Sequence, residues 1–172
     1  GKILRLRDDG SAAPDNPFVG RAGAKPEIYS YGHRHIQGLA RHPNGQIFAT
    51  EHGPLGGDEL NLIRPGQNYG WPEVTWGRDY VGAQPIGTGQ RSAAGMADPV
   101  LVWYPSVIGA SGLMIYTGDR FPEWRGSIFA GGLATQDVRR TVLDSDGKVT
   151  AHERLRIGQR VREVRQGPDG LI

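Results

Sequence analysis

The sequence lacks cysteine altogether, which excludes disulfide bonds, thiol catalysis and cysteine-ligated zinc and leaves the redox compartment open. It has no apolar run near the roughly 18 residues that a membrane helix requires, so no membrane span is expected. Its formal net charge of +2 is too small to indicate a nucleic-acid partner. It also lacks any 11-residue window with an apolar stripe of helical period, which argues against a helical domain.

Glycine and proline are abundant instead, at 27 and 12 of 172 residues, and they separate short strand-like runs. Hydrophobic residues make up 37% of the chain, which favours one globular all-β domain over residues 1–172. We expect a long surface loop over the glycine-rich residues 73–98. The expected strands cover residues 2–6, 27–31, 37–41, 46–50, 59–63, 100–104, 112–116, 127–130, 138–143, 148–150, 153–157 and 160–166.

A weak internal repeat indicates the architecture. Pro43-Asn44-Gly45 and Pro168-Asp169-Gly170 each follow a short extended run. Turn-rich, repetitive β sequences are typical of propellers with about 40 to 50 residues per blade, so the chain holds about four blades' worth of residues. A sandwich or barrel is the alternative. Because the chain opens in a strand-like run and closes two residues into another, we expect it to be part of a longer protein.

Residues 51–72 combine acids, glycines, prolines and aromatics more densely than any other segment. Pro54 has no amide hydrogen and disfavours a helical conformation at Gly53, so backbone carbonyls here are free to face a ligand. Asp58 and Glu59 add two carboxylates just after the turn. Oxygen ligands on an irregular loop suit a hard cation such as calcium, although a polar turn between two strands is the simpler interpretation.

Five motifs, in one order, resemble the soluble sugar dehydrogenases that depend on pyrroloquinoline quinone (PQQ), and within them the aldose sugar dehydrogenase branch. The motifs are Gly-His-Arg-His-Ile-Gln-Gly-Leu at 32–39, Glu-His-Gly-Pro-Leu-Gly-Gly-Asp-Glu-Leu-Asn at 51–61, Asn-Tyr-Gly-Trp-Pro at 68–72, Phe-Pro-Glu-Trp at 121–124 and Gly-Gln-Arg-Val-Arg-Glu-Val at 158–164. The resemblance covers nearly the whole chain and is weakest over 73–98. It implies a six-bladed β-propeller with the cofactor over its central channel, of which this chain is the C-terminal portion.

The resemblance also implies which residues bind PQQ. Two arginines two apart suit the cofactor's carboxylates, because guanidinium forms forked hydrogen bonds, although an exposed basic face would have the same spacing. The implied cofactor-binding residues are Arg34, His35, Tyr80, Gly132, Leu133, Ala134, Arg160 and Arg162.

Two of these positions depart from the family pattern. His35 stands where relatives carry Asn, and Ala134 stands where they carry a cofactor-binding Lys. Histidine can still hydrogen-bond a quinone or carboxylate. At Ala134, either the affinity for PQQ is lower or a neighbouring cation such as Arg139 compensates.

The same resemblance assigns metal and substrate positions. It implies that the carbonyls of Gly53 and Pro54 bind the calcium that touches the cofactor, and that Glu59 and Tyr69 hold a second, structural calcium, with Tyr69 offering its main-chain oxygen. Asp58 either caps the turn or lies near the substrate. Tyr104 lies where the family lines the sugar pocket, although such an aromatic is more often part of the core.

The function implied is oxidation of aldose sugars to lactones, with electrons passed to an external acceptor in a periplasmic or secreted enzyme. The family's catalytic base is a histidine in the N-terminal portion, and no residue here matches it, so we expect this portion alone to be inactive. Two alternatives stay open. One is a propeller that has lost the cofactor and acts as a binding module, and the other is a calcium-dependent lactonase.

Overall fold

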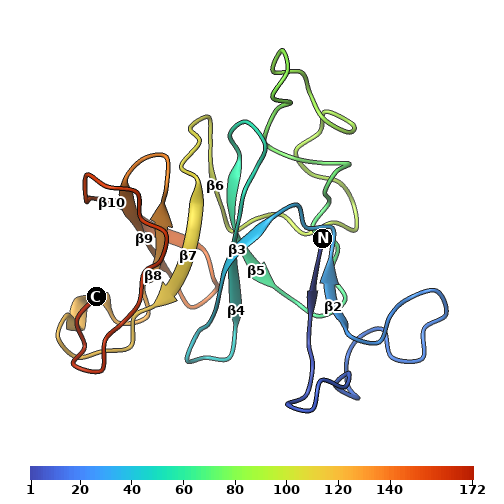
Figure 1. Cartoon of the computed structure of the whole chain (residues 1–172), viewed down its shortest axis with the longest axis horizontal. Coiled ribbons are helices and arrows are strands. Elements are labelled where there is room, and N and C mark those ends of the chain that lie inside the picture. Colours follow the sequence, from blue (N-terminus) through green and yellow to red (C-terminus); the bar gives the residue numbers. More distant parts are fainter.

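The computed structural model describes all 172 residues, and its strands form three separate antiparallel sheets (Figure 1). The first sheet pairs β1 (Lys2–Leu4) with β2 (Ile28–Tyr31). The second contains β3 (Ile36–Arg41), β4 (Ile47–Glu51), β5 (Asp58–Ile63) and β6 (Leu101–Trp103). The third contains β7 (Ala110–Ile115), β8 (Ile128–Gly132), β9 (Asp137–Leu143) and β10 (Val149–Arg156).

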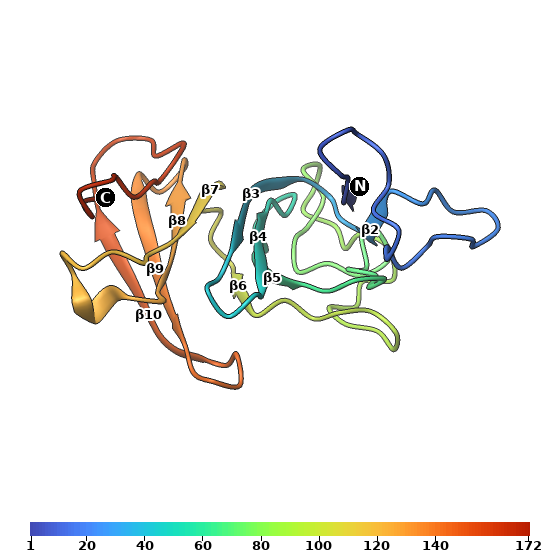
Figure 2. The same cartoon turned by 90° about the horizontal axis from the view of Figure 1, so that it is seen from below.

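Each four-stranded sheet is a simple meander, because every strand pairs with the next strand along the chain. The first strands of the two meanders, β3 and β7, lie side by side where the sheets face each other (Figures 1 and 2). Consecutive meanders that pack face to face with their first strands innermost are the blades of a β-propeller. The only helical element is the short 3-10 turn η1 (Pro122–Trp124), and no helix is long and apolar enough to cross a membrane.

The main core lies between these two blades. It contains the buried side chains of Phe48 and Leu60 from one blade and those of Leu113 and Ile128 from the other. Alternation along each strand sends these residues to the facing surfaces, and burying each of them stabilises the pair of sheets by about 1.5–3 kcal/mol.

The predicted repeat is confirmed at the level of hydrogen bonds. The His42 amide donates to the Gln46 carbonyl at 2.7 Å, and the Gly167 amide donates to the Leu171 carbonyl at 2.8 Å. In both turns the glycine of Asn-Gly or Asp-Gly adopts a positive φ, +94° at Gly45 and +81° at Gly170, which side chains disfavour.

Most predicted strands are confirmed to within two residues at each end. Residues 148–157, predicted as two strands, instead form the single strand β10, which pairs with β9 along its length. Residues 160–166, predicted as a strand, do not pair with any strand in a regular series of backbone hydrogen bonds. They form only isolated hydrogen bonds with neighbouring segments. The Gly112 amide donates to the Arg162 carbonyl at 3.0 Å, which lays this segment beside β7 much as β7 lies beside β3. The chain therefore contributes to four blades and completes two of them.

The predicted loop over residues 73–98 is confirmed, since it contains no strand or helix. It is nevertheless attached to the second blade. Arg78 and Leu55 exchange two backbone hydrogen bonds at 3.0 and 3.2 Å, and the Ala97 amide donates to the Asn68 carbonyl at 2.7 Å. These bonds hold the loop against the segment that the sequence singled out.

We predict that Gly38→Ala destabilises the contact between the blades. A Cβ atom at Gly38 would lie 2.6 Å from the Leu113 amide nitrogen and 2.8 Å from the Ser111 carbonyl oxygen, and neither backbone atom can move cheaply. We expect a loss of about 1–3 kcal/mol in the free energy of unfolding, measured by urea denaturation of the complete gene product. The control is Leu39→Ala, one residue along and half exposed, with an expected loss below about 1 kcal/mol. Equal urea midpoints for the two variants would contradict the tight contact.

Candidate functional site

The starts of the inner strands line one rim of the molecule. His52, beside the start of β3, hydrogen-bonds through its ring to the Ala110 carbonyl at the start of β7. Ala110 pairs with Gly132, whose carbonyl in turn accepts the Val161 amide at 3.4 Å. Residues predicted to bind the cofactor are therefore brought to a single rim from segments as far apart in sequence as Arg34 and Arg162: Arg34, His35, Gly132, Leu133, Ala134, Arg160 and Arg162.

Arg34 is held firmly on this rim. Its guanidinium donates to the carbonyl oxygens of His52 and Gly53, at 3.2 and 3.0 Å, and to the Tyr80 hydroxyl at 3.1 Å. The same group lies 5.3 Å from the centre of the Trp71 ring and 5.9 Å from that of Tyr80, within the range of cation–π attraction. Tyr80, one of the predicted cofactor-binding residues, thus lies beside Arg34. Trp71 is a second aromatic partner of Arg34, and the sequence spacing gave no indication of this contact.

A buried polar network lies behind Arg34. The His33 ring nitrogens lie 2.9 Å from the Glu51 carboxylate and 2.8 Å from the Ser30 hydroxyl, and the ring stacks on Tyr69 at 4.4 Å. The other Glu51 oxygen accepts the Arg34 backbone amide. His33 is therefore a buried structural histidine, and Glu51 positions Arg34. The sequence analysis gave Glu51 no role of its own, although it opens the motif at 51–61.

Asp58 is fully buried, and its carboxylate accepts hydrogen bonds only from backbone amides. One carboxylate oxygen accepts from Gly53 at 3.0 Å, and the other accepts from Ile108 at 2.9 Å and Gly109 at 2.8 Å. The carboxylate therefore holds the Gly53 turn of one blade against the start of β7 in the next. This geometry agrees with the interpretation of Asp58 as a cap, and direct contact with a substrate stays a prediction.

Below Arg34 lies a cavity of about 10 Å³, the room needed by a single water molecule or ion. Glu51, Gly53, Glu59 and Tyr69 are among the residues that line it. Burial raises the pKa of the Glu59 carboxyl to about 8, with the charges of Glu51 and Asp58 adding to the effect and the Asn61 amide, at 3.1 Å, opposing it. The Glu59 carboxyl thus has one hydrogen-bond donor, and a cation beside it would favour its ionised form.

The oxygen atoms of Glu59 and Tyr69, which line the cavity, and of Asn61, which is bonded to Glu59, suit a hard cation. The Asn61 side-chain oxygen is buried and accepts no hydrogen bond. The Tyr69 hydroxyl is fully used, donating to the Leu62 carbonyl at 2.6 Å and accepting the Arg64 amide at 2.9 Å, so that Tyr69 has only its main-chain oxygen to offer. No three His, Asp or Glu side chains converge as a metal site. A cation here would therefore depend on Glu59 together with amide and carbonyl oxygens, a donor set that calcium accepts.

At the other end of the rim, Arg160 and Arg162 have exposed side chains that form no ion pair within the chain. The side chain of Ala134 is also exposed. Arg139, which could replace the cation missing at Ala134, is instead bound to the buried Asp137 carboxylate at 3.1 Å. The rim therefore presents two arginines without anions, while Arg139 is already paired.

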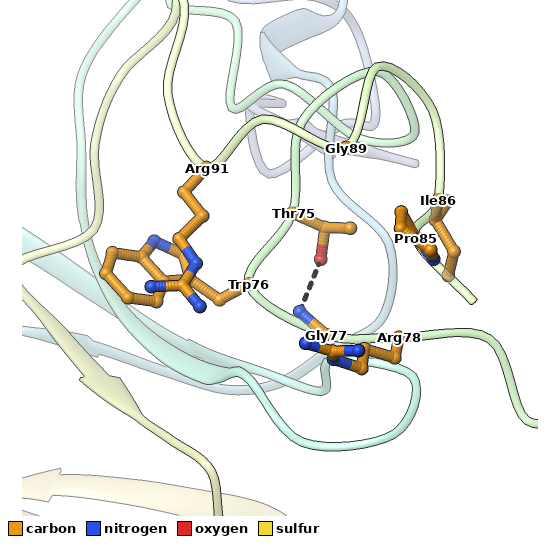
Figure 3. Close-up of a pocket in the computed structure, with 8 residues that line it drawn as sticks. All are labelled: Thr75, Trp76, Gly77, Arg78, Pro85, Ile86, Gly89 and Arg91. Atoms are coloured by element: carbon orange, nitrogen blue, oxygen red, sulfur yellow. Dashed lines mark hydrogen bonds between the residues drawn. The ribbon is translucent and has the colours of Figure 1, made fainter. Parts of the chain in front are cut away.

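Tyr104 belongs to an aromatic group that the sequence did not reveal. Its ring packs edge-on to Trp76 at 6.0 Å, and the Arg91 guanidinium lies 4.9 Å from Tyr104 and 4.5 Å from Trp76. Figure 3 shows Arg91 reaching over the Trp76 ring. Trp76 and Arg91 lie in the 73–98 loop, where no periodicity marks a residue for attention, and so they could not be selected from the sequence.

A family model described as glucose / sorbosone dehydrogenase matches residues 1–172. The chain belongs to the glucose/sorbosone dehydrogenase family. It is 43% identical over 175 residues to the aldose sugar dehydrogenase YliI of Escherichia coli, a match that covers 100% of this chain and 47% of that protein. The resemblance inferred from the five motifs is therefore confirmed.

Solved structures of proteins described as glucose and aldose sugar dehydrogenases have the same fold. A crystal structure of a glucose dehydrogenase superposes with a TM-score of 0.93 at 50% identity, over 99% of this chain and 49% of that one. The PQQ-bound form of an aldose sugar dehydrogenase from Streptomyces coelicolor superposes with a TM-score of 0.72 at 35% identity, over 95% and 42% of the two chains. The predicted fold, a segment of a six-bladed β-propeller, is confirmed, and the chain spans about half the length of the relatives it matches.

We predict that Glu59 makes the metal-free protein less stable as pH rises. The folded state keeps the Glu59 proton up to a pKa of about 8, whereas the unfolded chain releases it near the ordinary value of 4.5. Between these two values the folded state binds more protons, so the free energy of unfolding falls as pH rises, by on the order of 4 kcal/mol in total. Urea unfolding in chelator at pH 5 and pH 8 measures this loss.

The matched variant for this test is Glu59→Gln, which keeps the shape of the side chain and cannot ionise. Its stability should change by several kcal/mol less than that of the unsubstituted protein between the two pH values. An equal loss in both proteins would show that another group is responsible.

Proposed function

We propose that this protein is a PQQ- and calcium-dependent dehydrogenase that oxidises aldoses at the anomeric carbon to lactones and passes the electrons to an external acceptor. The observation that supports the proposal best is a set of three arginines that pair with no carboxylate of the chain: Arg34, bonded to the Gly53 carbonyl, and Arg160 and Arg162, on the segment that lies beside β7. A cofactor with three carboxylates needs such cations. Family membership and the PQQ-bound relative support the same reading.

The residues of this chain would bind and orient. Arg34, fixed by Glu51, Trp71 and Tyr80, would hold the cofactor from one side, and Arg160 with Arg162 would bind its carboxylates from the other. His35 and the backbone of Gly132, Leu133 and Ala134 would complete the contact surface. When bound, PQQ supplies a two-electron acceptor, and calcium polarises its oxygens.

Calcium would be held at two places, by the carbonyls of Gly53 and Pro54 and by Glu59 with the main-chain oxygen of Tyr69. The Gly53 carbonyl accepts a hydrogen bond from Arg34, whereas that of Pro54 accepts none. Tyr104 would face the sugar. No residue of this chain is proposed as the catalytic base. We expect the base to be a histidine in the N-terminal portion of the propeller, as the family resemblance implies. We propose a periplasmic or secreted location from the family alone.

A second candidate function is a binding module of the same family that no longer uses PQQ. It is favoured by one observation, the lack of a free cation at Ala134, since Arg139 is already paired with Asp137. A calcium-dependent lactonase is less consistent with the rim, because such an enzyme has no use for two unpaired arginines that bind carboxylates.

The test is reconstitution of the complete gene product with calcium and PQQ, followed by glucose oxidation with a dye acceptor. We expect saturable binding by absorbance titration and turnover that depends on both additions. Arg34→Met should raise the dissociation constant for PQQ about tenfold or more, because a charge-assisted contact is lost. The control Arg41→Gln changes an exposed arginine at the far end of β3 and should have no effect. Binding of calcium without binding of PQQ would favour the module, and lactone hydrolysis without quinone would favour the lactonase.

We also predict that Ala134→Lys strengthens PQQ binding. The Ala134 side chain is exposed on the rim, so a lysine can extend there without a clash and supply one more cation for a carboxylate. The dissociation constant for PQQ should fall about three- to tenfold at low salt, and the gain should shrink at high salt. The variant Ala134→Gln, similar in length but neutral, is the control. An equal gain from both would rule out a charge effect.

A further inference from the structure

A second cavity, of about 70 Å³, lies in the 73–98 loop and plays no part in the cofactor site (Figure 3). Its lining includes Thr75, Trp76, Arg78 and Arg91, with Pro85 and Ile86 closing one side. Thr75 fixes the cavity's inner wall, since its hydroxyl accepts the Gly77 amide at 3.1 Å. The cavity is large enough for an acidic group or a few water molecules but shallow for a whole sugar ring.

The charge in this cavity is unbalanced. Neither Arg78 nor Arg91 forms an ion pair with any carboxylate of the chain. The Arg78 side chain has one hydrogen bond, to the Ala83 carbonyl at 3.3 Å, and Arg91 has only its contacts with aromatic rings. The neighbouring Asp79 carboxylate accepts the Val81 amide at 2.8 Å and forms no ion pair with either guanidinium. Two exposed guanidinium groups without counterions could both hydrogen-bond an anion at this cavity.

Aromatic rings adjoin one of the two cations, Arg91. Trp76 lines the cavity. Tyr104 packs against the Trp76 ring and lies beneath the Arg91 guanidinium. Aromatic faces pack well against the apolar faces of sugar rings, whereas a site for a free inorganic anion has no need of them. The combination of rings and guanidinium groups therefore suits a sugar that carries a negative charge.

The cavity lies directly beside the turn proposed to hold calcium. Arg78 is bonded through its backbone to Leu55, and Gly77 packs so closely on this turn that a Cβ atom there would lie 2.4 Å from the Pro54 ring. A sugar whose anomeric carbon faces the turn can therefore direct its far end along the Trp76-Gly77-Arg78 segment. A charged group at that far end would meet Arg78 and Arg91.

We propose that the 73–98 loop forms a specificity subsite for acidic aldoses, sugars that bear a carboxylate at the end opposite the anomeric carbon, with Arg91 and Arg78 as its anion ligands. This inference rests on the proposed dehydrogenase function. It deepens that function by naming the substrate class. Sugar phosphates share the same anionic chemistry, and the experiment separates the two.

The first experiment compares glucuronate, glucose 6-phosphate and glucose as substrates of the reconstituted complete gene product. We expect kcat/KM to be highest for glucuronate, through a lower KM. Arg91→Gln should reduce the ratio of kcat/KM for glucuronate to that for glucose at least tenfold, because a guanidinium–carboxylate contact is lost. Arg91→Lys should restore part of the ratio, and the control Arg41→Gln should leave it unchanged. A preference for glucose 6-phosphate would assign the subsite to phosphate, and an unchanged ratio in Arg91→Gln would overturn the proposal.

The second experiment does not depend on activity. Calorimetric titration of the cofactor-free protein with glucuronate and with glucose should show tighter binding of glucuronate, weakened by salt and by Arg91→Gln. Equal, salt-independent binding of the two sugars would overturn the subsite. If no sugar is oxidised but glucuronate still binds through Arg91, the proposed dehydrogenase function fails while the subsite stands. Circular dichroism of each variant confirms that it is folded.

Discussion

The three hydrogen bonds of the Asp58 carboxylate are the constraint on which the rim depends. A buried carboxylate without donors would be costly, and here three backbone amides from two blades satisfy it. The bonds cross from the Gly53 turn to Ile108 and Gly109. If the turn shifted, the buried Asp58 carboxylate would lose hydrogen-bond donors. The position of the proposed calcium carbonyls is thereby coupled to the packing of one blade on the next.

The other two acids of the rim, buried Glu51 and partly buried Glu59, have different hydrogen-bond partners. Glu51 is satisfied by the Arg34 amide and by His33, and so it fixes the backbone from which Arg34 extends. Glu59 has only the Asn61 amide as a donor, and its raised pKa reports that deficit. Two carboxylates are thus used to build the site, and the third is left for a ligand. All three carboxylates lie between residues 51 and 59, so their position in the sequence does not separate their roles. What separates them is the number of hydrogen-bond donors within reach of each carboxylate.

The strands and turns were largely predictable because alternation, glycine and proline act locally. The turns at Asn44-Gly45 and Asp169-Gly170 could be identified because a positive φ is required there. The failures also have local causes. Residues 148–157 have an irregular apolar pattern, since β10 is an outer strand with one face in water, and pairing with β9 decides that they form one strand. Residues 160–166 have a strand-like pattern but no partner with which to form a ladder.

By itself, the sequence determined the all-β class, the turn positions and, through five ordered motifs, the family and most of the rim residues. Only the tertiary structure decided which side chains are paired. It showed that Arg139 is bound to Asp137 while Arg160 and Arg162 are free, that Asp58 binds backbone amides, and that Trp76 and Arg91 meet Tyr104. The physical reason is that periodicity reports the direction in which a residue points along its own strand. Pairing depends on contacts between blades and loops that are distant in the chain, and no local pattern encodes them.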